Sequence, residues 1–143
     1  VTEKEIATGV EGDLVNLKGK NILVVEDNEL NMEIIKTILV EYGMNVDEAY
    51  NGLEAVEKMK NTAADTYDLI LMDIMMPVMD GLEATRRIRR INREDCKRIP
   101  IVAMSANAFD EDVKHSLASG MSGHLSKPID IDKMSKMLSK YLR

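Results

Sequence analysis

Short continuous apolar runs alternate along the chain with longer segments in which apolar residues recur at helical spacing. The runs predict five buried strands, at residues 22–25, 44–49, 69–72, 99–104 and 123–126. The first helix is predicted between Asn28, an N-cap residue, and Gly43, a C-cap residue. A second helix follows the turn at Asn51 and Gly52, and three more are predicted at 81–91, 110–119 and 130–142.

The apolar positions of the predicted helices show which side faces inward. The first helix repeats apolar residues at Leu30, Ile34, Ile35, Ile38 and Leu39. The second has Ala55, Val56 and Met59 on its buried side, and the third has Leu82, Thr85, Ile88 and Ile91. Five strands interleaved with five helices predict a parallel sheet between two helix layers, which is a doubly wound α/β fold.

The length and the first residues define the domain organisation. A chain of 143 residues is long enough for one ordinary core and too short for two. Residues 1–19 are polar, lack periodicity and are interrupted by Gly9, Gly12 and Gly19, so we predict a linker or N-terminal arm there and one domain at 20–143. Because the chain starts at Val1, we expect it to be a piece of a longer polypeptide.

Composition and charge exclude several classes of protein. Charged residues make up 31% and hydrophobic residues 45%, as in soluble globular proteins. No apolar run approaches the roughly 20 residues of a membrane span, so we expect a cytoplasmic protein without direct membrane contact. The lone Cys96 suits a reducing compartment. The net charge of -6 argues against nucleic-acid binding, and the arginines at 86, 87, 89 and 90 are interpreted as the solvated side of a helix.

Polar side chains follow four of the predicted strands. Glu26 and Asp27 follow the first, Asp73 the third, Ser105 the fourth and Lys127 the fifth. Ligands of open α/β sheets bind in the crevice outside the carboxyl ends of the strands. We therefore expect these five side chains to meet at one rim of the sheet.

The three carboxylates predict a hard divalent cation. Neighbouring carboxylates repel by about 1 to 4 kcal/mol per pair, and all-oxygen ligands favour Mg²⁺, with Mn²⁺ as the alternative. Asp27 and Asp73 are the predicted direct ligands, and Glu26 is predicted to act through water. The backbone carbonyl of Met75 is the predicted third ligand, because it lies just past Asp73 in the loop.

A carboxylate beside such a cation can accept a phosphoryl group, a reaction that depends on positioning and charge neutralisation. Asp73 is the predicted nucleophile. Lys127 is expected to contact a phosphoryl oxygen and Ser105 to donate a hydrogen bond to another. Lys127 precedes Pro128, where a cis peptide bond would aim the lysine inward.

Each of these residues also has an ordinary structural interpretation. Glu26 and Asp73 could be helix caps or solvated loop residues, Ser105 could begin a turn, and Lys127 could be a surface residue. The methionines at 75, 76 and 79 are interpreted as core and loop packing, and neither histidine has the partners of a zinc site. The combination at one rim favours the functional interpretation.

Four segments carry a family resemblance: KNILVVEDNELN at 20–31, LILMDIMMPVMDG at 69–81, IPIVAMSANA at 99–108 and GHLSKPID at 123–130. In this order the chain resembles the receiver domain of two-component response regulators, from about Lys20 to Leu142. The resemblance implies a flavodoxin-like sheet of order 2-1-3-4-5. It implies that Glu26 and Asp27 form the acidic pair, that Asp73 is phosphorylated, that Ser105 is the switch hydroxyl and that Lys127 is the family's lysine.

The same resemblance implies cofactor and partners. Mg²⁺ is required, and the phosphoryl donor is a phosphohistidine on a histidine kinase or a histidine phosphotransfer domain. Asn28, Asn31 and the ending HLSKPID are similar to receivers fused to hybrid sensor kinases, so residues 1–19 would be a linker from a kinase core, in the cytoplasmic part of a membrane-anchored protein. Because the sequence ends at the last predicted helix, we expect no output domain to follow.

His124 departs from the family pattern, in which Tyr or Phe commonly stands three residues before the lysine. We expect Ser105 and His124 to form the switch. Our hypothesis is that Ser105 still moves toward the phosphoryl group, while the surface change beside His124 is smaller.

Several other functions stay open. A free-standing single-domain regulator is the nearest alternative. A Mg²⁺-dependent phosphohydrolase with an aspartyl phosphate would need a second acid two positions after Asp73, where the chain has Met75. A flavodoxin-like cofactor carrier would need a glycine-rich loop after the first strand, where the chain has acids. An unphosphorylated scaffold of the same fold is the fourth alternative.

Overall fold

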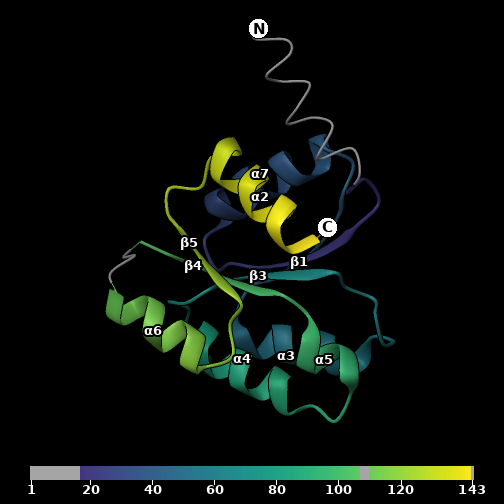
Figure 1. Ribbon diagram of the computed structural model, residues 1–143, viewed down its shortest axis with the longest axis vertical. Helices are drawn as coiled ribbons and strands as arrows, with labels where there is room; N and C mark the ends of the chain where they lie inside the picture. The colour runs from purple at the N-terminus through teal and green to yellow at the C-terminus, as the bar shows by residue number, and fades with distance from the viewer. Residues whose placement is uncertain (1–16, 107–109, 143) are drawn as a thin grey trace, which may run out of the picture.

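A five-stranded parallel sheet forms the centre of the molecule (Figure 1). The computed structural model describes residues 17–106 and 110–142. The strands lie in the order β2-β1-β3-β4-β5, and every pair of neighbours is parallel. Their bounds are β1 Asn21–Val25, β2 Asn45–Ala49, β3 Leu69–Asp73, β4 Ile101–Ser105 and β5 Gly123–Ser126. The predicted fold class and strand order are confirmed.

Helices cover both faces of this sheet, as Figure 1 shows. On one face lie α2 Glu29–Glu41 and α7 Ile131–Leu142. On the other lie α3 Gly52–Asn61, α4 Gly81–Arg90, α5 Glu94–Arg98 and α6 Asp110–Ala118. The short helix α5 was not predicted, because its five residues, EDCKR, are too few and too polar to show an apolar repeat.

The sheet is buried on both faces, which explains its continuous apolar runs. All residues of β3 and β4 are buried. Alternate residues belong to two separate clusters, with Leu69 and Leu71 packed against α2 and α7, and Ile70 and Met72 packed against the opposite layer. Burial on both faces in this way is typical of the strands of a parallel sheet.

The helix α2 shows why helical spacing alone overestimates burial. Its side chains at Leu30 and Ile34 are 70% and 43% exposed, although they belong to the predicted apolar repeat. The residues that pack on the sheet are Met32, Ile35, Ile38 and Leu39. Asn28 caps the helix as predicted, since its side chain accepts a hydrogen bond from the Asn31 amide.

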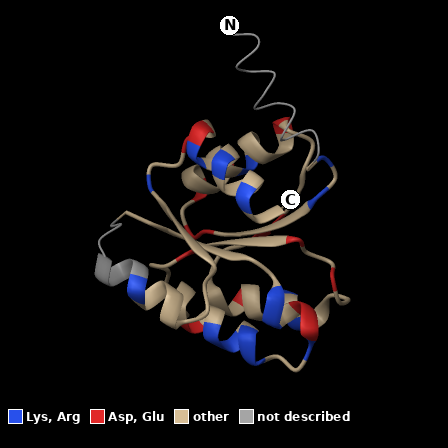
Figure 2. Cartoon of the chain, in the orientation of Figure 1, with Lys and Arg blue, Asp and Glu red and all other residues tan. Residues whose placement is uncertain are grey.

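The arginines of α4 differ in exposure, whereas the sequence predicted that all four would lie on the solvated side of a helix. Lys and Arg lie mainly on the helices of both outer layers (Figure 2). Arg87 and Arg90 are exposed, but Arg89 is partly buried and donates to the carbonyl oxygens of Gly120 and Cys96 at 2.9 and 3.0 Å. Arg89 thus joins α4 to α5 and to the turn before β5.

The first described residue lies close to the predicted boundary between the arm and the domain. Leu17 is buried and packs in the cluster of α2 and α7. The predicted arm at 1–19 stays a prediction, since residues 1–16 lie outside the described residues. None of the helices in the described part of the chain combines the length and apolarity that crossing a membrane requires.

Gly81 offers a test of how tightly the chain closes beside the end of β3. A Cβ atom at this position would lie 2.2 Å from the backbone oxygen of Asp73. Because a backbone atom cannot swing aside, we expect Gly81→Ala to lower the free energy of unfolding by about 1 to 3 kcal/mol in urea denaturation. In the control Gly123→Ala, the Cβ meets the end of the Tyr141 side chain, which can move, so the loss should be smaller. Equal losses would contradict this explanation.

The ion pair beside α5 predicts a pH dependence of stability. Arg93 contacts Asp95 at 2.6 Å, and this hydrogen bond and the Asp65 amide lower the Asp95 pKa to about 2 although burial opposes the shift. A lowered pKa stabilises the fold above the unfolded value of about 3.9 and loses this contribution as the pH falls toward 2. We expect Asp95→Asn to be less stable than the parent in urea at pH 6, and the difference to shrink by pH 2.5. The exposed Glu94→Gln is the control.

Candidate functional site

The acidic pair lies in the turn between β1 and α2. Glu26 is fully buried, and its amide donates to the carbonyl oxygen of Ala49 at the end of β2. Its carboxylate oxygen Oε2 accepts a hydrogen bond from the Asn28 amide at 3.2 Å, so the turn is fixed from inside. Asp27 is exposed. One acid thus faces the protein interior, and the next faces the open side of the rim.

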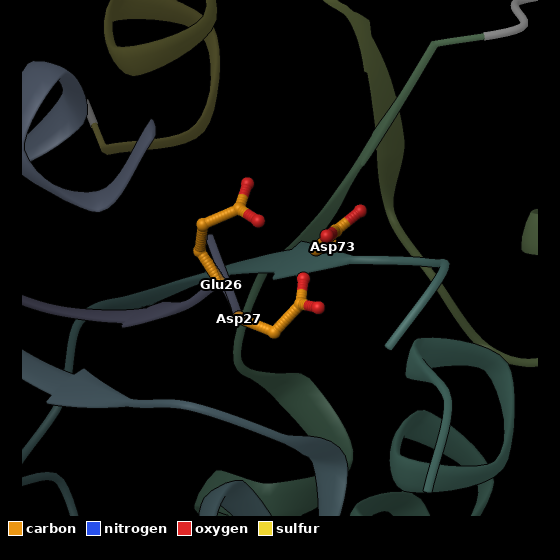
Figure 3. A group of neighbouring side chains, drawn as sticks. All are labelled: Glu26, Asp27 and Asp73. Carbon is orange, nitrogen blue, oxygen red and sulfur yellow. The ribbon is translucent and has the colours of Figure 1, made fainter. Parts of the chain in front are cut away.

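Asp73 is the last residue of β3, the central strand of the sheet, and is buried. In the β1–β3 register Val25 pairs with Met72, so the residues that follow them, Glu26 and Asp73, come next along adjacent strands. Ligand oxygens of Glu26, Asp27 and Asp73 all lie within 4.8 Å of one another. Figure 3 shows the three side chains reaching toward one another from two elements.

The charges at this rim perturb one another. Burial, followed by the hydrogen-bond and charge interactions with Glu26, raises the pKa of Asp73, although Lys127 opposes the shift. A raised pKa in a carboxyl group means that its anion is destabilised where it stands. The site therefore favours any additional positive charge that can approach the Asp73 oxygen atoms.

Lys127 follows β5, the edge strand of the sheet, and reaches the same rim. Its Nζ lies 2.8 Å from Oε1 of Glu26 and 3.4 Å from Oδ2 of Asp73. Burial lowers the Lys127 pKa, but Glu26 and Asp73 outweigh burial and raise it, so the amine stays charged. The buried Oε1 of Glu26 is neutralised by this ion pair at 2.8 Å. The peptide bond between Lys127 and Pro128 is cis.

Ser105 and His124 lie next to each other on the last two strands. Ser105 ends β4 and is buried, and its Oγ lies 3.1 Å from Nε2 of His124. The amide of Lys127 donates to the carbonyl oxygen of Ser105 at 2.8 Å. The predicted hydroxyl and the predicted lysine are therefore joined through the backbone.

The loop after Asp73 carries the least predictable part of the rim. Met75 is 78% exposed. Its backbone carbonyl as a metal ligand stays a prediction. Val78 has a positive φ of 68°, and the Met79 amide donates to the Pro77 carbonyl oxygen, forming a tight turn. The Gly81 amide then closes the loop on the Ile74 oxygen at 2.9 Å.

Sequence reasoning missed two residues that hold this loop. Asp80 caps α4 by accepting a hydrogen bond from the Glu83 amide at 2.8 Å. Gly52 donates its amide to the Met79 oxygen, and a Cβ there would meet that same oxygen at 2.5 Å. The Asp80 cap could have been predicted from the Asp-Gly pair at 80–81. The contact between Gly52 and Met79 could not, because it joins segments far apart in the sequence.

Comparisons with known proteins match this arrangement. The chain is 42% identical to the osmosensing histidine protein kinase SLN1 of Saccharomyces cerevisiae, over 92% of this chain and 11% of that protein. It is 38% identical to hybrid signal transduction histidine kinase L of Dictyostelium discoideum, over 92% of this chain and 8% of that protein. The chain thus spans only about a tenth of the length of these relatives.

Two solved structures share the fold. One is the receiver domain of a Pseudomonas aeruginosa sensor histidine kinase, with a magnesium ion coordinated in its active site cleft. It is 37% identical, has a TM-score of 0.78, and the match covers 87% of this chain and 98% of that one. The other is the Saccharomyces cerevisiae Ssk1 receiver domain in complex with the histidine phosphotransfer protein Ypd1, with 32% identity, a TM-score of 0.78, and coverage of 87% and 90%.

The family comparison covers most of the described chain. Residues 22–139 match the response regulator receiver domain. Together with the rim geometry and the relatives more than 30% identical, this match shows that the protein belongs to the response regulator receiver domain family.

Proposed function

We propose that Asp73 accepts a phosphoryl group from a phosphohistidine and that the domain acts as a switch in a phosphorelay. The observation that carries this proposal is the convergence of Glu26, Asp27 and Asp73 within 4.8 Å, with the Lys127 ammonium 3.4 Å from Asp73. A buried nucleophilic carboxylate with a metal site and a fixed cation beside it matches what phosphoryl transfer requires. Membership in the receiver family supports the same reaction.

The residues present fit Mg²⁺. Three carboxylates face one ammonium group at the rim, so their negative charge is only partly compensated when they are ionised. The donors are all oxygen atoms, which hard divalent ions prefer. Asp27 and Asp73 would bind the ion directly, Glu26 would act through water, and Mn²⁺ should substitute. The relative with magnesium in its cleft supports this assignment.

The chain's own residues then have separate roles in the transfer. A carboxylate oxygen of Asp73 forms a bond to phosphorus as the P–N bond of the donor breaks, and the bonding electron pair returns to the donor imidazole nitrogen. Lys127 contacts an oxygen of the transferred group, and the Ser105 hydroxyl donates a hydrogen bond to another. Mg²⁺, when bound, supplies charge neutralisation for the attacking oxygen and the phosphoryl group.

The donor and the parent protein are inferred from the relatives. We propose that the chain is the receiver part of a hybrid sensor histidine kinase and exchanges phosphoryl groups with a histidine phosphotransfer domain. The curated relatives are histidine kinases, and the Ssk1 receiver binds such a partner. A free-standing regulator is the alternative. We propose a switch rather than an enzyme with its own substrate, since the residue two positions after Asp73 is Met75 and not a second acid.

The proposal includes a cytoplasmic location. The single cysteine, Cys96, is free and buried. Unpaired thiols are typical of reducing compartments, which supports this location.

Intact-mass spectrometry tests the acceptor directly. With phosphoramidate and Mg²⁺ the parent should gain one phosphoryl group, because phosphoramidate has the P–N bond of a phosphohistidine. Asp73→Asn should gain none, and a chelator should prevent the gain in the parent. Modification of Asp73→Asn to the same extent as the parent would refute Asp73 as the acceptor.

Calorimetric titration with Mg²⁺ tests the ligand set. We expect Asp27→Asn to weaken binding by roughly tenfold or more, because removing even an outer-shell partner commonly costs that much. Glu26→Gln should lose less, since Glu26 acts through water and also contacts Lys127. The exposed Glu94→Gln, on α5, is the matched control and should bind as the parent does. A larger loss in Glu26→Gln than in Asp27→Asn would reverse the two assignments.

A further inference from the structure

The segment that leaves Asp73 is held at both ends by amides from the first positions of two helices. The Gly81 amide, at the start of α4, donates to the Ile74 oxygen at 2.9 Å. The Gly52 amide, at the start of α3, donates to the Met79 oxygen at 2.9 Å. The first amides of a helix have no acceptor within that helix, so both are available for contacts with the loop. α3 and α4 pack together on one face of the sheet, which brings the two amides to the same segment (Figure 1).

The held segment contains a turn in an unfavourable conformation. Val78 has a φ of 68°, and the Met79 amide donates across it to the Pro77 oxygen. A hydrogen bond over two residues with a positive φ between them is the strained form of γ-turn, and a β-branched residue is especially unfavourable there. Such a conformation persists where the surrounding structure holds it. The Gly52 amide supplies such a hold, because it binds the residue that follows Val78.

Gly52 also permits the close approach of α3 to this loop. A Cβ atom at position 52 would lie 2.5 Å from the Met79 oxygen and 2.9 Å from the Asp80 oxygen. Both oxygens belong to the backbone and cannot rotate aside, so either α3 or the loop would have to move. α3 is fixed by packing in the core through Val56, whereas the loop is 76% exposed at Val78. The loop would therefore be displaced.

We propose that Gly52 is a positioning residue for the Mg²⁺ site. It lies on a different element from the proposed ligands and acts through the segment that carries one of them, the backbone carbonyl of Met75. The inference rests on the proposed function and adds to it a residue that holds the metal-binding loop in place. A side chain at position 52 would displace the segment 74–79 and, with it, the Met75 carbonyl.

Calorimetric titration of Gly52→Ala with Mg²⁺ tests this role. We expect the variant to bind Mg²⁺ roughly tenfold more weakly than the parent, the low end of the range for residues that orient a metal ligand. Gly19→Ala is the matched control. It is the same substitution at the other end of the sheet, before β1, where Gly19 has a φ of 85° and an added Cβ meets no atom within 4 Å. Backbone strain destabilises this control, but its Mg²⁺ affinity should equal that of the parent.

Urea unfolding of both variants separates positioning from a general loss of stability. The titrations are carried out under conditions in which both variants remain folded. Weaker Mg²⁺ binding in Gly52→Ala but not in Gly19→Ala supports the proposal. A Gly52→Ala affinity equal to that of the parent overturns it, and so does an equal loss of affinity in Gly19→Ala.

Amide hydrogen exchange in the parent provides a test that needs no variant. If the contact between Gly52 and Met79 strengthens Mg²⁺ binding roughly tenfold, bound Mg²⁺ must strengthen the contact by the same factor. Saturating Mg²⁺ should therefore slow the exchange of the Gly52 amide, measured by NMR, by roughly tenfold. The Thr62 amide donates to the Lys58 oxygen at the other end of α3 and should exchange at an unchanged rate, as the internal control.

The exchange rate and the phosphorylation assay together separate this inference from the proposed function. An unchanged exchange rate of the Gly52 amide in saturating Mg²⁺ overturns the inference. The proposed function stands in that case if the parent still gains a phosphoryl group on Asp73. A parent that binds no Mg²⁺ and gains no phosphoryl group overturns both.

Discussion

Electrostatic repulsion among three carboxylates at the edge of a buried sheet is the constraint around which this molecule is organised. A neighbouring pair of ionised carboxylates repels by about 1 to 4 kcal/mol, depending on the effective dielectric, which is a substantial fraction of the stability of a small domain. Lys127 offsets part of this repulsion through its contacts with Glu26 and Asp73. The remaining repulsion supports the proposed binding of a divalent cation at this rim.

The scaffold holds these charges by packing and backbone hydrogen bonds. The two sides of β3 are packed in separate clusters, so a register shift of one residue would exchange the side chains of the two clusters and displace Asp73 from the rim. The loop that follows is closed by the amides of Gly52 and Gly81. A site fixed in this way is preorganised, because its backbone is held before any ligand arrives. Ser105 and His124 contact each other at 3.1 Å on the last two strands, and His124 also lines the groove beside α7.

Much of the site could be predicted from sequence because parallel strands have their carboxyl ends at one edge. The apolar runs fixed the strands, and the polar residue after each run then had to reach that edge, which placed Glu26, Asp27, Asp73 and Lys127 together. Exposure along α2 was less predictable, since apolar spacing does not show how wide a face the sheet can cover. Leu30 and Ile34 remain exposed for this reason. The role of Arg89 was also hidden, because its acceptors on α5 and before β5 are backbone atoms.

By itself, the sequence determined the alternation of strands and helices, the fold class and the identity of the chemical groups at the rim. These follow from local periodicity and from the direction of parallel strands. Only the tertiary structure decided which oxygen atoms lie within reach of one another, which carboxylates Lys127 contacts and that Ser105 faces His124. Such contacts depend on the strand register and on how side chains from distant segments share a buried space, and neither property is encoded in the spacing of residues along the chain.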